Sequence, residues 1–269
     1  MKTTATEIKE RVSILAPVID AVQVGDNRYV AGHMSPLAAA SIVLDCGLDV
    51  VVHISCRDRN RIALQADILG AAALGVTSLV LVRGEKFSDN APIRAKGVFE
   101  VGATGLIGLA NLLGNEAGLA AEPGFYIGSF VTVFDPGDDW KAARIQEKID
   151  VGARFLQTQP CLNAELLQKY MQKLVERKIL HRSSVVVEVP LLTSMEEARL
   201  LREQDKGAPI PEAAVKRIAT ADDPVAEGIS VCAEMLMDLR SIPGVSGVNI
   251  QYGGDPENVV AAITQAGMG

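Results

Sequence analysis

The sequence predicts an α/β fold of the TIM (β/α)8 barrel type, as a single barrel domain over residues 1–269. Short runs rich in β-branched residues alternate with Ala- and Leu-rich amphipathic stretches, which is typical of parallel strands covered by helices. The runs are almost continuously apolar, as expected of strands buried on both faces. An open doubly wound sheet also fits this alternation. The length of 269 residues favours the barrel, which normally takes about 250 residues.

Seven runs are expected to be strands. They cover residues 20–24, 50–55, 78–82, 125–130, 154–158, 184–189 and 247–251. Helical patterns cover residues 6–16, 36–46, 61–74, 104–114, 140–151, 164–177, 194–203, 224–239 and 256–265. Since a barrel has eight strands and this chain opens with a helical pattern, we expect the first strand to be lacking or substituted.

Local signals mark where several elements begin. Asp58 or Asn60 can cap the helix at 61, Ser194 precedes Glu197 by three residues, and Asp255 stands before a proline. The polar stretch 204–218 contains two prolines and is expected to be a loop insertion.

Composition excludes several classes of function. The chain has 26 Lys and Arg against 33 Asp and Glu, a net charge of −7, and 48% apolar residues. Nucleic-acid and anionic-membrane binders need concentrated positive charge, so we expect neither partner. No apolar stretch reaches the roughly 18 residues of a membrane span, and charged residues occupy the N-terminus, which predicts a cytoplasmic protein. The four cysteines lie far apart, which argues against a disulfide framework or metal clip.

Polar residues gather where the predicted strands end, and in parallel α/β proteins these ends form the functional face. They are Gly25, Asp26, Asn27, His53, Ser55, Arg57, Asp58, Arg83, Gly84, Glu85, Gln157, Thr158, Gln159, Glu188, Asn249 and Gln251. We expect these groups to converge on one mouth that binds a polar, planar ligand rich in heteroatoms.

A metal site is not expected at the second strand. Alternation places His53, Ser55 and Arg57 on one face of the strand and Cys56 on the other, so H-x-x-C cannot supply a ligand pair. His53 could equally be a core histidine bonded to a carbonyl group.

Other polar groups also keep a structural alternative. The RDRNR run at 57–61 could be a solvated helix start, and Glu188 could form a structural ion pair instead of acting in catalysis. The glycines at 102, 105 and 108 are typical of close helix packing. Residues 253–255 are typical of a turn with a helix cap.

Three segments resemble the methylenetetrahydrofolate reductase family. HISCRDRNRIALQADILGAAALGVTSLVLVRGE (53–85) matches its H-[LI]-[TS]-C strand, helix start and R-G-D strand end. KIDVGARFLQTQP (148–160) is similar to K-V-x-A-G-A-x-x-x-x-T-Q-P, and DAVQVGDNRYVAGHMSP (20–36) to the segment entering the H-x-T-C strand. Members of this family are flavin-dependent barrels that convert methylenetetrahydrofolate to methyltetrahydrofolate.

The resemblance implies a cofactor, FAD, and a tetrahydrofolate derivative as substrate. It places His53 and Arg83 against the flavin, Lys148 near the flavin phosphates, and Gln159 on the pterin. The turn at 25–27 would border the flavin ring. The predicted cofactor-binding residues are Asp26, Asn27, His53, Ser55, Arg57, Arg83, Gly84, Ser129 and Lys148, and the predicted substrate-binding residues are Gln159, Asn249 and Gln251.

Three departures from the family pattern bear on catalysis. The family opens with a strand reading roughly F-E-F-F-P-P, whose glutamate is the acid expected to protonate the folate; this sequence begins after that point, as an N-terminally truncated member would. The R-G-D aspartate is Glu85 here. The segment GSFVTVFDPGDD (128–139) lacks the family's usual histidine or asparagine, and Lys141 stands where a carboxylate often lies. The catalytic residues are therefore expected to be Gln159 with Glu85 or Glu188 as the replacement acid.

Three functional hypotheses follow. The first is flavin-dependent reduction of 5,10-methylenetetrahydrofolate, or its reverse. The second is a flavin-free methyltransferase subunit that binds methyltetrahydrofolate and exchanges the methyl group with a corrinoid protein. The third is a structural or regulatory partner whose sheet edge is covered by another chain. A homo-oligomer, or a subunit of a heteromeric complex with a redox or corrinoid protein, is expected in each case.

Overall fold

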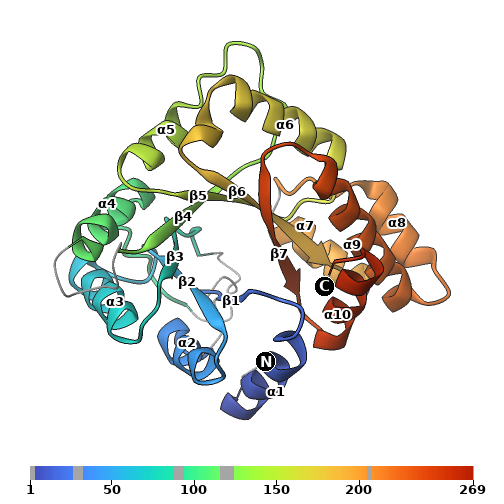
Figure 1. Cartoon of the computed structure of the whole chain (residues 1–269), viewed down its shortest axis with the longest axis horizontal. Helices are drawn as coiled ribbons and strands as arrows, with labels where there is room; N and C mark the ends of the chain where they lie inside the picture. Colours follow the sequence, from blue (N-terminus) through green and yellow to red (C-terminus); the bar gives the residue numbers. More distant parts are fainter. Residues whose placement is uncertain (1–3, 27–32, 88–93, 116–123, 205–206, 269) are drawn as a thin grey trace. The chain divides into compact units, whose positions relative to one another are not determined.

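The computed structural model describes residues 4–26, 33–87, 94–115, 124–204 and 207–268 (Figure 1). Within these residues seven strands form one sheet, and their order in the sheet is their order in the chain, from β1 to β7. The β1–β2, β2–β3, β3–β4 and β6–β7 pairs are parallel. A doubly wound sheet would reverse its strand order at a switch point, whereas a barrel keeps the chain order. The predicted α/β fold of the TIM-barrel type is confirmed.

The elements lie close to their predicted positions. The strands are β1 (Ala21–Val24), β2 (Asp49–Ser55), β3 (Ser78–Val82), β4 (Tyr126–Val131), β5 (Phe155–Thr158), β6 (Ser184–Leu191) and β7 (Val245–Tyr252). The helices are α1 (Ala5–Leu15), α2 (Pro36–Asp45), α3 (Arg61–Ala73), α4 (Ala103–Gly114), α5 (Ala143–Asp150), α6 (Ala164–Glu176), η1 (Ile179–His181), α7 (Met195–Gln204), α8 (Glu212–Thr220), α9 (Pro224–Ser241) and α10 (Pro256–Gln265). None of the helices within the described ranges is long and apolar enough to cross a bilayer.

The chain divides into two compact units. Unit 1 comprises Met1–Ser129 and Gln146–Phe155, and unit 2 comprises Phe130–Ile145 and Leu156–Gly269. Strands β4 and β5 each begin in unit 1 and end in unit 2. The prediction of a single domain stays a prediction.

In unit 1, the core lies between strands β1–β3 and helices α2, α3 and α4 (Figure 1). Every second residue of β2 enters this core, namely Val50, Val52 and Ile54, and so does Cys56 directly after the strand; all four are almost completely buried. Leu64 and Ile68 of α3 pack in the same cluster. Because side chains alternate along a strand, the odd-numbered residues of β2 lie on the opposite face from the helices. The predicted alternation of this strand is confirmed.

In unit 2, β6 shows the same alternation. Val185, Val187 and Val189 have no exposed surface, and helix α9 packs against this strand. Glu188 has the opposite parity along β6 and therefore points to the face away from these valines.

The prediction of a loop at 204–218 is wrong for its second half, because helix α8 occupies Glu212–Thr220. Pro211 is the N-cap residue, with φ −61° and ψ 139°, and its fixed φ suits a helix start. Val215 and Ile218, one turn apart, are buried. The prolines that indicated a loop therefore mark the entrance to an amphipathic helix.

The helix predicted from residue 140 begins later, at Ala143. Ala142 has φ 52°, a left-handed conformation that cannot continue a right-handed helix. The Trp140 ring lies outside the helix, with its centroid 5.6 Å from that of Phe134 and 5.7 Å from that of Tyr170. Packing of the tryptophan thus takes precedence over the local helical pattern.

The predicted caps are present. The Asn60 side chain accepts a hydrogen bond from the Ala63 backbone N–H at 2.9 Å, so Asn60, not Asp58, caps α3. Ser194 Oγ accepts from Glu197 N at 3.2 Å, and Asp255 Oδ1 accepts from Glu257 N at 3.0 Å. These contacts satisfy N–H groups that a helix start leaves unpaired.

The four thiols are free and differ in accessibility, which predicts selective labelling. Burial raises the pKa of Cys56 to about 11 despite the nearby Arg83, that of Cys161 to about 11, and that of Cys232 to about 12, whereas Cys46 is exposed. Because the thiolate is the reactive form, iodoacetamide at neutral pH should modify only Cys46 in the native protein. Peptide mass mapping checks this, and rapid modification of Cys56 would contradict it.

Candidate functional site

The candidate residues fall into two groups, one in each unit. Unit 1 holds Asp26, His53, Ser55, Arg57, Arg83, Gly84, Glu85, Ser129 and Lys148. Unit 2 holds Gln159, Glu188, Asn249 and Gln251. Asn27 lies outside the described residues. In the described ranges, no three His, Cys, Asp or Glu side chains are grouped so that they could hold a metal ion.

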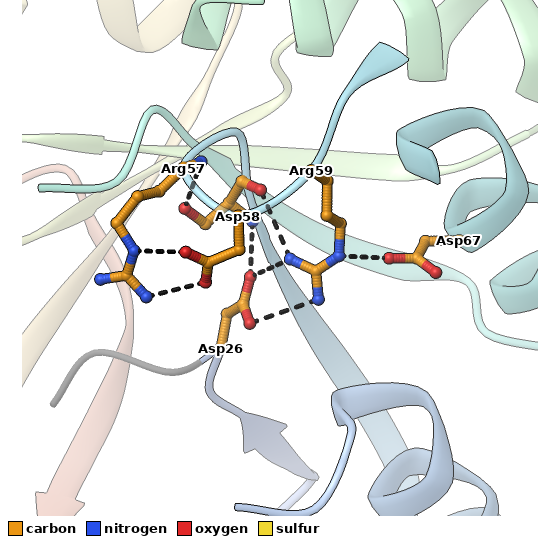
Figure 2. Close-up of polar contacts among 6 residues, drawn as sticks. Asp26, Arg57, Asp58, Arg59 and Asp67 are labelled. Atoms are coloured by element: carbon orange, nitrogen blue, oxygen red, sulfur yellow. Dashed lines mark hydrogen bonds and ion pairs between the residues drawn. The ribbon is translucent and has the colours of Figure 1, made fainter. Parts of the chain in front are cut away.

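Arg59 links Asp26 to Asp67 at the end of β2 (Figure 2). Its Nη1 lies 2.6 Å from Asp26 Oδ2, and its Nε lies 2.5 Å from Asp67 Oδ2. Asp26 Oδ2 also accepts a hydrogen bond from the Ser55 backbone N–H at 2.9 Å. Burial opposes the charge on Arg59, but the ion pairs with both carboxylates outweigh it and raise the guanidinium pKa. This charged chain ties the turn after β1 to the end of β2 and to α3.

Arg57 is held differently, by its neighbour in the chain. Its Nε and Nη2 donate to the two carboxylate oxygens of Asp58 at 2.7 and 2.8 Å, a bidentate arrangement that raises the Arg57 pKa (Figure 2). The Phe87 ring covers its guanidinium, with Cζ 4.6 Å from the ring centroid. Arg57 is 4% exposed. The guanidinium therefore already has a carboxylate at its edge and a ring on one face.

Gly84 lets the ends of β2 and β3 approach closely. Its φ is +79°, and a Cβ at this position would lie 2.2 Å from Ser55 Oγ and 2.9 Å from Arg57 Cβ. A residue with a side chain would have a strained backbone there and would displace Ser55 and Arg57. The glycine of the RG[DE] pattern is thus required by local geometry, and it brings Arg83 and Glu85 to the strand end with exposed side chains.

Three predicted cofactor residues have distinct environments. His53 is half-buried on the face of β2 that points away from the helices. Lys148 is half-buried in the last turn of α5. Ser129 has the same parity as Ile127, which belongs to the helix-side core, and its hydroxyl donates to the Leu81 carbonyl at 3.0 Å. Ser129 thereby contributes to strand packing.

The unit 1 residues fit a flavin. Arg83 presents an exposed cation and His53 a half-buried ring. A planar ring with an anionic tail requires cations and stacking faces of this kind.

In unit 2, Glu188 and Gln157 form a buried pair. Gln157 Nε2 donates to Glu188 Oε2 at 2.9 Å; Gln157 is 1% and Glu188 4% exposed. The Glu188 backbone N–H donates to Thr158 Oγ1 at 3.0 Å, which fixes the strand at this point. Asn249 is the register partner of Glu188 on β7. The three polar side chains thus come from adjacent positions of β5, β6 and β7.

Gln251 lies two residues beyond Asn249, on the same face of β7. Its Oε1 atom is buried and has no hydrogen-bond partner among the described residues. A buried acceptor normally finds a donor, so this atom suits contact with a ligand N–H group.

Gln159 uses its carboxamide within unit 2. Its Oε1 accepts from Val133 N at 2.8 Å, and its Nε2 donates to Val133 O at 3.3 Å and to Gly207 O at 3.2 Å. The side chain imitates a peptide group and connects the residues after β4 to the segment between α7 and α8. Contact of its amide donors with a pterin, as the resemblance implies, requires one of these bonds to be exchanged.

Replacing Gln159 with Leu is therefore expected to lower the free energy of unfolding by about 2 kcal/mol, since backbone groups of Val133 and Gly207 lose their partners. Urea denaturation measures this loss. The exposed Gln172, substituted with Leu as a control, should change stability by less than about 0.5 kcal/mol. Equal losses in the two variants would show that the Gln159 bonds do not stabilise the fold.

Some residues in these contacts carry no signal in the sequence. Asp67 lies within a helix and resembles any solvated acid, and Phe87 and Phe99 lie in a polar connection after β3. The structure shows that Asp67 pairs with Arg59. It also places the Phe87 ring against Arg57 and the Phe99 ring against Arg83.

Fold and polar strand ends together define the class, an α/β protein of the TIM-barrel type. The sequence profile described as methylenetetrahydrofolate reductase matches residues 3–251, nearly the whole chain. The chain belongs to the methylenetetrahydrofolate reductase family. This membership assigns it to folate one-carbon metabolism, as an enzyme of the oxidoreductase type or a related one.

Two solved structures share the fold. The coenzyme F420-dependent tetrahydromethanopterin reductase from Methanopyrus kandleri is 10% identical, with a TM-score of 0.56, over 98% of this chain and 95% of its own. A fungal β-1,4-galactanase is 12% identical, with a TM-score of 0.54, over 90% of this chain and 80% of its own. Identities this low indicate the fold alone. The search of curated proteins gave no significant match.

Proposed function

We propose that this protein reduces 5,10-methylenetetrahydrofolate to 5-methyltetrahydrofolate, or catalyses the reverse reaction, with FAD as its cofactor. The observation that carries the proposal is the family match over residues 3–251. The unit 1 residues support it, because their cations and half-buried histidine fit a flavin.

The unit 1 residues hold the cofactor in this proposal. Arg83 and His53 lie against the ring, Lys148 pairs with the phosphates, and Gly84 lets β3 approach β2, which keeps Arg83 beside the β2 strand end. When bound, flavin supplies the hydride that the substrate's methylene carbon accepts. Asp26 accepts hydrogen bonds from Arg59 and from the Ser55 N–H, and these contacts hold it in place as an acceptor.

The unit 2 residues act on the folate. Glu188 donates the proton to the nitrogen that leaves as the five-membered ring opens, and Gln157 orients the carboxyl group through Oε2. Gln159, Asn249 and Gln251 contact the pterin, whose N–H and C=O groups match carboxamides. Glu188 is preferred over Glu85 as the acid because it is buried and held by a hydrogen bond, whereas Glu85 is exposed.

The product identifies the reaction. Protein loaded with chemically reduced FAD is mixed with 5,10-methylenetetrahydrofolate under anaerobic conditions, and the folates are separated and weighed by mass spectrometry. Formation of 5-methyltetrahydrofolate in amounts stoichiometric with the flavin is expected. Unchanged methylenetetrahydrofolate, with FAD bound, would rule out the reductase proposal.

One observation favours a second candidate, a flavin-free methyltransferase that exchanges methyl groups with a corrinoid protein. The segment 128–139, which begins within β4, lacks the family's usual histidine or asparagine, and the hydroxyl of Ser129 in this segment is bonded to the Leu81 carbonyl. Under this alternative the protein would bind methyltetrahydrofolate but not FAD. Equilibrium titration with each ligand separates the two candidates.

A further inference from the structure

Phe99, in the connection between β3 and α4, lies against Arg83. The Arg83 Cζ atom is 4.5 Å from the centroid of the Phe99 ring. A guanidinium group is planar and delocalised, and it is attracted to the face of an aromatic ring at this distance. One face of the Arg83 guanidinium is therefore covered by a ring of the protein itself.

The backbone around Phe99 is shaped for this contact. Phe99 has φ 46°, a left-handed conformation that is uncommon for a residue with a bulky side chain. Gly97 lies beneath the ring, and a Cβ at that position would be 2.3 Å from Phe99 Cε2. Such conformations persist only where surrounding contacts enforce them, and they are concentrated at functional sites.

Two hydrogen bonds fix the chain on either side of Phe99. The Val98 N–H donates to the Arg57 carbonyl at 2.7 Å, and the Glu100 carboxylate accepts from the Arg61 N–H at 3.1 Å. Arg57 lies in the turn after β2, and Arg61 is the first residue of α3. The ring is thus held over Arg83 by the same segment that carries the RDRNR pattern.

The side chains of Arg83 and Arg57 differ in how accessible they are to a ligand. Arg57 is 4% exposed, and two of its nitrogens pair with Asp58. The Arg83 side chain is exposed although one face is covered by Phe99. Its opposite face can therefore receive a second planar group.

We propose that Phe99 is a positioning residue that turns Arg83 into a stacking platform for a planar, nitrogen-rich aromatic ring. The isoalloxazine of a flavin and the pterin of a folate share this chemistry. The inference rests on the proposed function for its choice of ligands, and it differs from a phosphate-pairing role for Arg83 because stacking needs the ring and not the phosphate.

The binding test uses ring probes without phosphate, namely lumiflavin and 6-methylpterin, titrated by fluorescence quenching. Phe99→Leu should weaken binding of the stacked probe about fivefold, with unchanged thermal unfolding. Phe87→Leu is the matched control, because Phe87 covers the arginine that is already paired, and it should bind as the wild type does. The probe whose affinity falls in Phe99→Leu shows whether isoalloxazine or pterin stacks on Arg83. An unchanged affinity of Phe99→Leu for both probes, or binding of neither probe by the wild type, would overturn the proposal.

A second readout needs no ligand and no activity. In the wild type, ring current from Phe99 should shift the Arg83 Nε–H resonance upfield in an NMR spectrum, and Phe99→Leu should abolish this shift while Phe87→Leu preserves it. A resonance that does not respond to Phe99→Leu would contradict the stacking itself. If probe binding depends on Phe99 but no folate is reduced, the stacking proposal is supported and the reductase proposal fails. If folate is reduced but Phe99→Leu does not change probe binding, the stacking proposal fails and the reductase proposal is retained.

Discussion

Substitution of Glu188 with Gln is expected to lower kcat for methylenetetrahydrofolate reduction by about 10²–10⁴-fold, the usual range for loss of a general acid. Gln keeps the shape of the side chain and can still accept the hydrogen bond from Gln157 Nε2, so the free energy of unfolding should change little. Steady-state kinetics with saturating folate, together with urea denaturation, measure both quantities.

The same assay on Glu85→Gln decides between the two candidate acids. Glu85 is exposed at the end of β3, and its variant should lose far less activity than Glu188→Gln. Glu196→Gln, at an exposed position in the first turn of α7, is the matched control and should retain wild-type kcat. A large loss in Glu85→Gln with normal activity in Glu188→Gln would reverse the assignment.

Substitution of Arg59 with Met is expected to lower the free energy of unfolding by about 3–5 kcal/mol, the usual cost of removing one member of a buried ion pair. Asp26 is 8% exposed, and Arg59 is its cationic partner within 2.6 Å. Urea denaturation measures the loss. Arg61→Met, which changes an exposed arginine of the same RDRNR run, should cost less than about 0.5 kcal/mol.

The double variant Asp26→Asn/Arg59→Met tests the cause of that loss. A neutral Asn can still accept the hydrogen bond from the Ser55 N–H, and no buried charge remains at residue 26. The double variant should therefore be more stable than Arg59→Met alone. If it is less stable, or if Arg59→Met behaves like Arg61→Met, the ion pair does not explain the role of Arg59.

The parts of the fold that the sequence predicts well are those governed by burial. The alternation of His53, Ser55 and Arg57 with Ile54 and Cys56 follows from the two faces of a parallel strand, and the structure places them accordingly. Cap residues such as Asn60 act within one turn of chain, so their partners are also predictable.

The remaining features depend on contacts between distant segments. The ion pair of Asp26 with Arg59 spans 33 residues, and the hydrogen bond of Gln159 with Gly207 spans 48. A local pattern carries no information on such distances. The left-handed Ala142, which delays α5, and the stacking of Phe99 on Arg83 depend on packing in the same way.

The most direct test of the central claim is an anaerobic absorbance spectrum of the protein loaded with FAD, recorded before and after addition of 5-methyltetrahydrofolate. Bleaching of the visible flavin bands, with formation of methylenetetrahydrofolate, is the result that the reductase proposal predicts. Retained folate binding without any binding of FAD would contradict it and favour methyl transfer to or from a corrinoid protein.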